Sequence, residues 1–346
     1  MTGDRHGVTP PVAVEVRRGG RVESRHRLSV AVLRPDGRIV LAAGELDEPI
    51  YPRSAIKPFQ ALPLVESGAA DRFHLSSREL ALACASHSGE EGHVEAVRAW
   101  LLRLGLDETA LACGPRPPLS AEVARRLIAR GEEPSPLHDN CSGKHAGMLT
   151  LARHLGVPET DYVHPHHPVQ RRIRDVLSEL TGHAVVDPPG IDGCTAPNWP
   201  IPLRALARAA ARFATGADLP PARMRAAARL IAACRAEPWY LAGTGRAGTR
   251  IVAVLADGLV KSGAEGVYLG FFPKAGLGLA LKVEDGAGRA SEVALVALLD
   301  SLQLFTPEAR RALADLAQPQ VLDSRGRRVG EIVPAADFPP IVGRKG

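Results

Sequence analysis

The chain has 346 residues, of which 45% are hydrophobic, and this length predicts one large domain or two closely joined lobes. Residues 1–7 are polar and charged with no apolar stretch behind them, so we expect no secretory signal. The apolar runs are too short for a bilayer span, so we expect no membrane association. Five cysteines spread over a long chain do not resemble a disulfide framework, and we predict a reduced, cytoplasmic setting.

The formal net charge is +5, but its distribution argues against nucleic acid as a partner. Arginines alternate with acidic residues along predicted helices, as in residues 171–175, whereas a nucleic-acid site needs basic residues gathered on one face. Only six of the 43 basic residues are lysine. Because lysine can lose its proton at accessible pH and arginine cannot, the retained lysines are candidates for proton transfer.

The predicted elements begin with strands at 12–17 and 28–43, the second containing a hairpin turn at Pro35-Asp36-Gly37. From residue 54 to about residue 235 the apolar spacing is helical. The predicted helices in this part are 77–84, 90–104, 120–130, 143–155, 167–181, 202–214 and 221–235. The remaining predictions are a hairpin of 249–255 with 258–262, strands 266–271, 277–283 and 327–333, and helices 291–303 and 307–316.

Strands near both ends and helices between them predict an α/β (α+β) fold, with a sheet built from both termini and an inserted helical lobe. We predict a single catalytic unit over residues 8–346. Its sheet lobe comprises 8–53 plus 240–346, and its helical lobe comprises 54–239. The active site is expected in the cleft between the two lobes.

Residues 243–248 match the G-x-G-x-x-G pattern of dinucleotide-binding loops. Such a loop needs a strand before it and a helix after it, so that phosphate meets the helix N-terminus. Because 249–254 is predicted as a strand, we reject a nicotinamide site here.

A first chemical motif lies in residues 51–58, where a helix is predicted to start near Ser54. At spacing i, i+3 the hydroxyl of Ser54 and the amine of Lys57 share one helix face. A neutral Lys57 can take the Ser54 proton and make the oxygen a nucleophile, and the helix N-terminus favours the developing negative charge. The alternative is a helix-capping Ser54 with Lys57 at the surface, since S-x-x-K patterns are common by chance.

A second motif, Lys261-Ser262-Gly263, lies at the end of a predicted strand. This K-[ST]-G pattern accompanies S-x-x-K in serine β-lactamases and penicillin-binding proteins, whose layout is similar to the one predicted here. Ser86, in segment 84–90, follows an apolar helix and precedes a polar turn, where its side chain can face a cleft. The alternative is a capping serine before the helix near Glu90.

Two cysteines lie in polar segments that contain glycine. Cys141 opens a predicted helix, where its pKa should be lowered, and Cys194 lies in the loop Asp192-Gly193-Cys194. Two thiolates with a nitrogen donor suit zinc with one open position. Unrelated buried thiols are the alternative, because no C-x-x-C pair is present.

Taken together, these motifs resemble the rhizobial-type L-asparaginase family, the asparaginase II domain family. The resemblance rests on five segments that follow in order along the chain: 51–58, 84–90, 138–145, 192–194 and 261–266. It implies a β-lactamase-like fold, a homodimer and the hydrolysis of L-asparagine to L-aspartate and ammonia.

The resemblance also implies roles for particular residues. It implies two Ser-Lys tandems, Ser54 with Lys57 and Ser86 with Lys261. It further implies a zinc ion that positions the substrate, held by Cys141, Lys144 and Cys194 with Asp192 close by.

We expect Ser54 to attack the carboxamide carbon with Lys57 as base, and the second tandem to assist water in resolving the ester. Arg53 and His145 are candidates for the α-carboxylate of the substrate. Residues 237–249 depart from the family pattern, so the substrate is less sharply predicted than the chemistry. The rivals are a glutaminase-type or penicillin-recognising serine hydrolase of the same fold, and a non-enzymatic zinc scaffold.

Overall fold

The computed structural model describes residues 9–339 and groups the chain into two compact units. Among the described residues, the sheet unit comprises 9–50, Ile201–Thr215 and 254–339. The helical unit comprises Tyr51–Pro200 and Gly216–Ala253. These bounds differ from the predicted lobes at 201–215, which join the sheet, and at 51–53 and 240–253, which join the helices. Residues 8 and 340–346 of the predicted catalytic unit lie outside the described residues.

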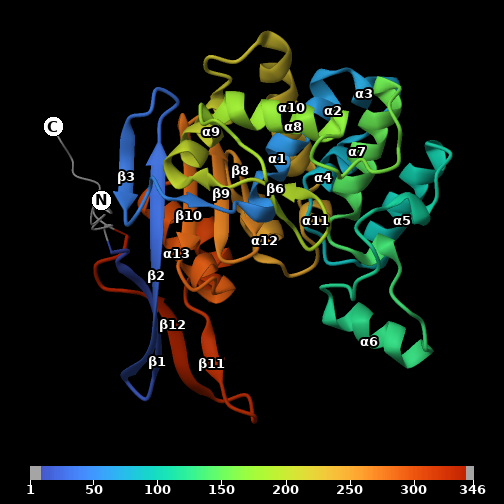
Figure 1. The fold of residues 1–346 in the computed structure, drawn as a ribbon. Helices are drawn as coiled ribbons and strands as arrows, with labels where there is room; N and C mark the ends of the chain where they lie inside the picture. Colours follow the sequence, from blue (N-terminus) through green and yellow to red (C-terminus); the bar gives the residue numbers. More distant parts are fainter. Residues whose placement is uncertain (1–8, 340–346) are drawn as a thin grey trace, which may run out of the picture. The chain divides into compact units, whose positions relative to one another are not determined.

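The sheet unit contains an eight-stranded sheet in the order β11-β12-β1-β2-β10-β9-β8, with β3 paired to β2 beside this path (Figure 1). Its strands are β1 Val12–Arg18, β2 Arg21–Leu33, β3 Ile39–Ala43, β8 Leu259–Gly263, β9 Val267–Phe272, β10 Leu277–Val283, β11 Gln320–Leu322 and β12 Arg328–Pro334. Since β1–β3 and β8–β12 come from opposite ends of the chain, the prediction of a sheet built from both termini is confirmed.

The long strand β2 connects the two halves of this sheet. Its first half pairs with β1, and its second half pairs with β10 and β3. The β1–β2 turn is Gly19–Gly20, whose φ angles of +53° and +76° suit a two-residue hairpin. The apolar pattern did not predict residues 21–27 as a strand, because most of them are polar and exposed.

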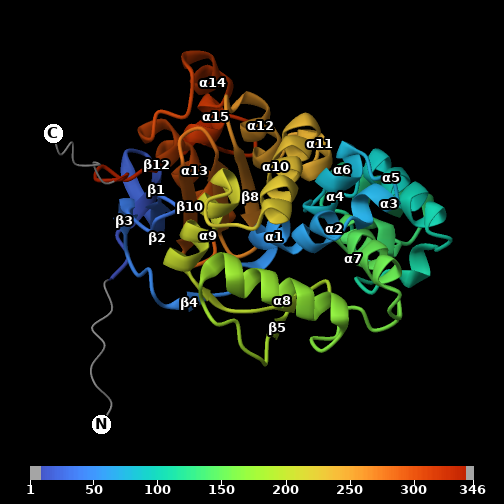
Figure 2. The same ribbon diagram turned by 90° about the horizontal axis from the view of Figure 1, so that it is seen from above.

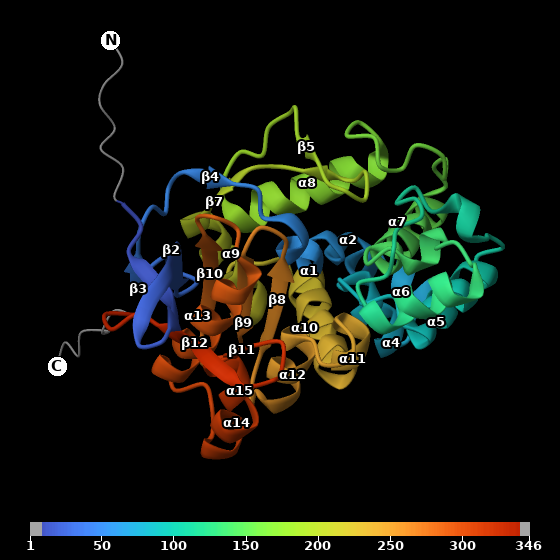
Figure 3. The same cartoon turned by 90° about the horizontal axis from the view of Figure 1, so that it is seen from below.

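Two long helices pack on the sheet. Figures 2 and 3 show the strands between α9 (Leu203–Thr215) and α13 (Gly288–Ser301). The close approach of α9 to β10 requires Gly278, where a Cβ atom would lie 2.2 Å from the carbonyl oxygen of Ala207. The smaller elements of this unit are β4 Pro49–Ile50, β7 Ile201–Pro202, α14 Pro307–Ala312 and α15 Ala314–Ala317.

The helical unit is built around α4, which packs against α10, α7 and α5. Its elements are η1 Arg53–Ile56, α1 Lys57–Gln60, α2 Leu62–Glu66, α3 Ala69–Arg72, α4 Ser77–Ala83, α5 Glu91–Arg103, η2 Glu108–Ala110, α6 Ala121–Arg130, η3 Pro136–His138, α7 Ser142–Leu155, α8 Pro168–Thr181, β5 Gly190–Ile191, β6 Pro197–Asn198, α10 Pro221–Ala236, α11 Pro238–Leu241 and α12 Ala247–Val254. Within residues 9–339, none of the helices is both long and apolar enough to cross a bilayer.

One element was predicted wrongly. The segment 249–255, expected to be a strand, belongs to the helix α12. Its β-branched residues suggested a strand, but the buried positions 247, 248, 251 and 252 follow the period of a helix, and this packing outweighs local propensity. The nicotinamide site is still excluded, because the glycine loop 243–248 is preceded by the helix α11 rather than by a strand.

Candidate active site

The side chain of Lys57 lies at the centre of a polar cluster inside the helical unit. It is only 1% exposed, although lysine is rarely buried without partners. Its Nζ atom donates hydrogen bonds to Ser86 Oγ at 3.1 Å, to Cys141 Sγ at 3.1 Å and to the carbonyl oxygen of Ala85. The structure therefore brings Lys57, Ser86 and Cys141 together from three separate segments.

Ser54 lies one turn before Lys57 in the same short helical segment. The first turn, η1, is a 3₁₀ helix that ends with the Lys57 amide donating to the carbonyl oxygen of Ser54. Residues at i and i+3 of a 3₁₀ helix are nearly eclipsed, so the two side chains leave the helix on the same side. Ser54 is half-buried, and the preceding Arg53 has a φ of +53°, a strained conformation for a residue with a side chain.

Ser86 lies in the turn that follows α4. Its backbone N–H donates to the carbonyl oxygen of Leu241 at 3.1 Å, and the next amide, that of His87, donates to Asn140 at 3.2 Å. The imidazole of His87 hydrogen-bonds Ser142 at the start of α7 through Nε2, at 2.9 Å. These bonds fix the turn between α11 and α7 and thereby orient the Ser86 hydroxyl toward Lys57.

Two sulfur atoms and a second buried lysine form the other half of the cluster. Lys144 Nζ donates to Cys194 Sγ at 3.0 Å. A hydrogen bond between the two cysteines, together with burial, raises the pKa of Cys141 to about 12. The same hydrogen bond lowers the pKa of Cys194 to about 5, although burial opposes this shift. The positive charge of Lys144 contributes to the lowering as well. Burial alone would lower the pKa of Lys144, but the charges of Cys194 and Cys141 outweigh it and raise the pKa.

The contacts among Cys141, Lys144 and Cys194, the predicted zinc ligands, are compatible with a zinc site. Within residues 9–339 no group of three His, Cys, Asp or Glu side chains is arranged to hold a metal, so a metal here requires the amine of Lys144 as third ligand. Cys194 contacts both the amine of Lys144 and the thiol of Cys141, and it favours its thiolate form. Tetrahedral zinc with three protein ligands would retain one open position for substrate.

Arg53 and Asp192 form an ion pair beside Cys194. Arg53 Nε donates to Asp192 Oδ1 at 2.5 Å, and Asn198 Nδ2 donates to the same oxygen at 3.2 Å. Two hydrogen bonds thus position the Asp192 carboxylate. One of them comes from Arg53, the residue that directly precedes Ser54 in the sequence.

His145 is fully buried and is positioned by a residue that the motifs did not indicate. Tyr162 Oη accepts a hydrogen bond from the backbone N–H of Ala112 at 2.9 Å and forms a second hydrogen bond with His145 Nδ1 at 2.7 Å. Burial, followed by the charge of Lys144, lowers the pKa of His145 to about 3, so the ring is neutral. Its Nε2 atom has no hydrogen-bond partner among the described residues.

Asp139 is a second buried group for which no role was predicted. Its Oδ1 accepts from the Cys141 amide at 2.7 Å, whereas Oδ2 lacks a hydrogen bond within the described part of the chain. Burial and the neighbouring Cys141 raise the pKa of Asp139 to about 6. Its place within segment 138–145 was the available signal, but nothing in the sequence indicated burial.

Lys261 lies on β8 of the sheet unit, as the K-[ST]-G motif predicted. It is buried, and its Nζ donates to the carbonyl oxygen of Ser262 at 2.6 Å. Because Ser86 belongs to the helical unit, the tandem of Ser86 with Lys261 stays a prediction.

The atypical loop 237–249 is anchored to the start of α5. Glu90 accepts two hydrogen bonds from Thr244, through the backbone N–H at 2.8 Å and the hydroxyl at 2.7 Å. The indole of Trp239 donates to that hydroxyl at 2.9 Å and stacks on the ring of His93 at 3.9 Å. The loop therefore has a fixed conformation of its own close to the Ser86 turn.

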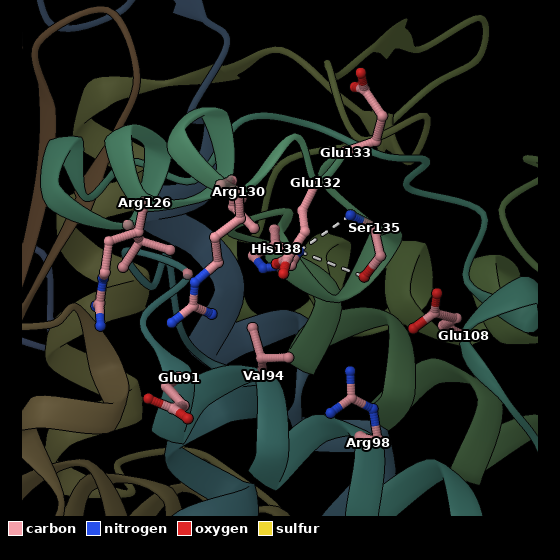
Figure 4. Close-up of a pocket in the computed structure, with 13 residues that line it drawn as sticks. Glu91, Val94, Arg98, Glu108, Arg126, Arg130, Glu132, Glu133, Ser135 and His138 are labelled. Carbon is pink, nitrogen blue, oxygen red and sulfur yellow. Dashed lines mark hydrogen bonds between the residues drawn. The ribbon is translucent and has the colours of Figure 1, made fainter.

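A cavity of about 500 Å³ lies apart from these residues, between α5, α6 and η3. Figure 4 shows Arg130 of α6 and Arg98 of α5 pointing into this space, and Glu133 pointing away from it. Three arginines and four glutamates line the cavity, so it favours neither sign of ligand charge. It contains none of the predicted site residues.

Comparison with known families agrees with the motifs. The model of the L-asparaginase II family matches residues 14–334, nearly the whole chain. The chain therefore belongs to this family, as the resemblance predicted. No match was found among the curated proteins.

Several solved structures are similar to this chain. Mglu in its native form is 18% identical, with a TM-score of 0.47 over 81% of this chain and 65% of that chain. The chain thus spans slightly less than two thirds of Mglu. A β-lactamase from Mycobacterium bovis is 14% identical, with a TM-score of 0.37 over 84% of this chain and 94% of that chain. A β-lactamase/D-alanine carboxypeptidase from Pseudomonas syringae is 14% identical, with a TM-score of 0.40 over 83% and 93%.

The Tyr162 hydroxyl yields a stability prediction. In Tyr162→Phe, the Ala112 amide and His145 Nδ1 lose their partner while still buried, so the free energy of unfolding should fall by about 1–3 kcal/mol. Chemical denaturation would measure this. Tyr240→Phe is the control, since the Tyr240 hydroxyl donates no hydrogen bond among residues 9–339, and it should change stability by less than about 0.5 kcal/mol. Equal stability of the two variants would contradict the assigned hydrogen bonds.

Proposed function

We propose that this protein is an L-asparaginase that hydrolyses the side-chain amide of L-asparagine to L-aspartate and ammonia. The family supports hydrolysis. The observation that carries the proposal is the buried amine of Lys57, which hydrogen-bonds Ser86 Oγ and follows Ser54 by one 3₁₀ turn. An amine that contacts one serine hydroxyl and follows a second serine by one helical turn is suited to proton transfer in acyl chemistry.

In the first half of the reaction, Ser54 Oγ forms a bond to the carboxamide carbon and its proton passes to the neutral amine of Lys57. The carbon–nitrogen bond then breaks, and the departing nitrogen takes a proton from the Lys57 ammonium and leaves as ammonia. Ser86, which contacts the same amine, can relay this proton. The product of this half is an aspartyl ester of Ser54.

In the second half, water attacks the ester carbon and gives up its proton to a neutral amine. The bond from carbon to Ser54 Oγ breaks, the ammonium formed in this step returns its proton to the Ser54 oxygen, and aspartate leaves. We assign assistance in this step to the second predicted tandem, Ser86 with Lys261. Both lysines act as bases here, a role that arginine cannot fill.

We propose that zinc is bound by Cys141, Lys144 and Cys194, whose contacts fit such a donor set. When bound, the ion would supply a positive charge that positions the substrate. Arg53, His145 and Asp192 are the residues of this chain proposed to bind the charged ends of the amino acid. The pairing of Arg53 with Asp192 supports a site that presents both signs of charge.

A glutaminase-type or a penicillin-recognising serine hydrolase remains the alternative within this chemistry. Both would use the same serine and lysine and would differ in the shape of the substrate pocket. The homodimer and the cytoplasmic location also belong to the proposal, and rest on the family resemblance and on the cysteine content.

Hydrolysis of L-asparagine, L-glutamine and a chromogenic β-lactam by the purified protein tests the proposed function. We expect asparagine to be turned over about a hundredfold faster than glutamine, because one more methylene moves the carbonyl by roughly an ångström from Ser54. Release of ammonia measures the two amides, and absorbance measures the β-lactam. Comparable turnover of glutamine, or hydrolysis of the β-lactam alone, would favour one of the alternatives. No hydrolysis of any of the three would support the scaffold.

The metal site predicts about one zinc ion per chain in purified protein. Elemental analysis should find a clear loss of zinc in Cys194→Ser, because the thiolate is replaced by a poor ligand. Cys234→Ser is the control, since Cys234 is buried on α10 and is not among the proposed ligands. Equal zinc in all three proteins would rule out Cys194 as a ligand.

A further inference from the structure

Residues 112–120 form a strap that is held at both ends by other parts of the helical unit. At one end, Ala112 donates its N–H to Tyr162 Oη at 2.9 Å and accepts from Thr195 Oγ1 at 2.9 Å. At the other end, the Ser120 amide donates to the carbonyl oxygen of Ser88 at 2.9 Å. The strap thus connects the turn that contains Cys194 to the turn that contains Ser86.

Three prolines, at positions 115, 117 and 118, restrict the backbone of this strap. It also lies directly against the Ser86 turn, because a Cβ atom on Gly89 would come within 2.7 Å of Pro118 Cβ. A restricted backbone with fixed ends places the Cα atom of Arg116, the residue between the prolines, beside the candidate site.

The guanidinium of Arg116 lies beside the proposed zinc ligands. Its Nε atom is 3.8 Å from Asp139 Oδ2, and a Cβ atom on Gly193 would lie 3.2 Å from its Nη1. The absence of a side chain at Gly193 therefore leaves room for the guanidinium next to Asp192 and Cys194. The side chain of Asp139 is 0% exposed, whereas that of Arg116 is 51% exposed.

The hydrogen-bonding capacity of Arg116 is unused within residues 9–339. The distance of 3.8 Å to Asp139 gives an electrostatic contact but is too long for a hydrogen bond, and the guanidinium donates no other hydrogen bond among these residues. A guanidinium has five N–H donors in a planar fork that matches a carboxylate. Arg116 is therefore a half-exposed cation with donors available at the edge of the candidate site.

Arg53 and His145, proposed above to bind the α-carboxylate, already interact with other side chains. Arg53 donates to Asp192 at 2.5 Å, which neutralises much of its charge. His145 is completely buried, and one of its two nitrogens is occupied by Tyr162. A free amino acid needs a cation that is accessible and has hydrogen-bond donors available, and the half-exposed Arg116 meets both requirements.

We propose that Arg116 is a specificity-determining residue that binds the α-carboxylate of the amino-acid substrate. This inference rests on the proposed asparaginase function and adds the contact that would select a free amino acid over an amide in a peptide or a neutral carboxamide. The strap places this contact between the turns that carry Ser86 and Cys194.

Three amides separate the carboxylate contact from other effects. They are L-asparagine, succinamic acid, which keeps the carboxylate without the amine, and 3-aminopropanamide, which keeps the amine without the carboxylate. In Arg116→Gln, KM for asparagine and for succinamic acid should rise about ten- to a hundredfold, as expected for the loss of a charged hydrogen-bonded pair. The kcat for these substrates should change by less than about threefold. For 3-aminopropanamide, kcat/KM should stay within about twofold of the wild type, because no carboxylate contact is lost.

Arg116→Lys should recover part of the affinity, because the charge remains but the planar fork is lost. Arg130→Gln is the matched control, an exposed arginine on α6 that lies outside the candidate site, and it should leave all three substrates unaffected. Thermal denaturation of each variant reports separately on the contact with Asp139.

The outcomes distinguish the inference from the proposed function. If Arg116 serves only to offset the buried Asp139, Arg116→Gln will lower the melting temperature and change kcat/KM equally for all three amides, which would overturn the inference. An active wild type with unchanged KM in Arg116→Gln would also overturn it and leave the proposed function intact. A wild type without asparagine hydrolysis would contradict the proposed function, and the inference with it.

Discussion

Burial of the Lys57 amine is the constraint on which the rest of the candidate site depends. Removing an ammonium group from water costs several kcal/mol unless hydrogen bonds replace its hydration. Lys57 obtains these bonds from the carbonyl of Ala85, from Ser86 and from Cys141, so α1, the turn after α4 and the start of α7 must converge. The same convergence places the Lys57 amine beside the Ser86 hydroxyl in buried surroundings, where the proposed proton transfer depends on the positions of both groups.

A second buried lysine repeats this arrangement with sulfur as its partner. Lys144 contacts Cys194, and the attraction between an ammonium and a thiolate compensates in part for burying both. The Asp192 carboxylate and the Arg53 guanidinium add a further pair beside it. The site is thus an array of alternating charges whose members stabilise one another, and such an array suits a zwitterionic substrate.

The sequence predicted the parts of this architecture that follow a simple period or a specific motif. The helices from α4 to α10 and the strands β9, β10 and β12 were predicted within a few residues, because their apolar residues recur with a helical period or form short runs bounded by turns. The helix α12 was missed because β-branched residues concealed its helical period, and residues 21–27 were missed because exposed strands lack an apolar pattern. The motifs predicted Lys57 next to Ser54, but the hydrogen bond from Lys57 to Ser86 depends on long-range packing. Tyr162 and Arg116 carried no signal, and Asp139 carried only its place within segment 138–145, since only the folded chain shows that they are buried or held at the site.

The most direct test of this account is the turnover of asparagine by Lys57→Arg. A guanidinium keeps the charge but stays protonated at working pH, so it cannot act as the base. With folding verified by circular dichroism, kcat should fall about a hundredfold or more, the usual contribution of a general base. Lys57→Met, which fits the buried position without a charge, should lose at least as much, whereas Lys274→Arg, at an exposed position, should remain active. A folded Lys57→Arg protein with near-normal kcat would contradict the central role assigned to this amine.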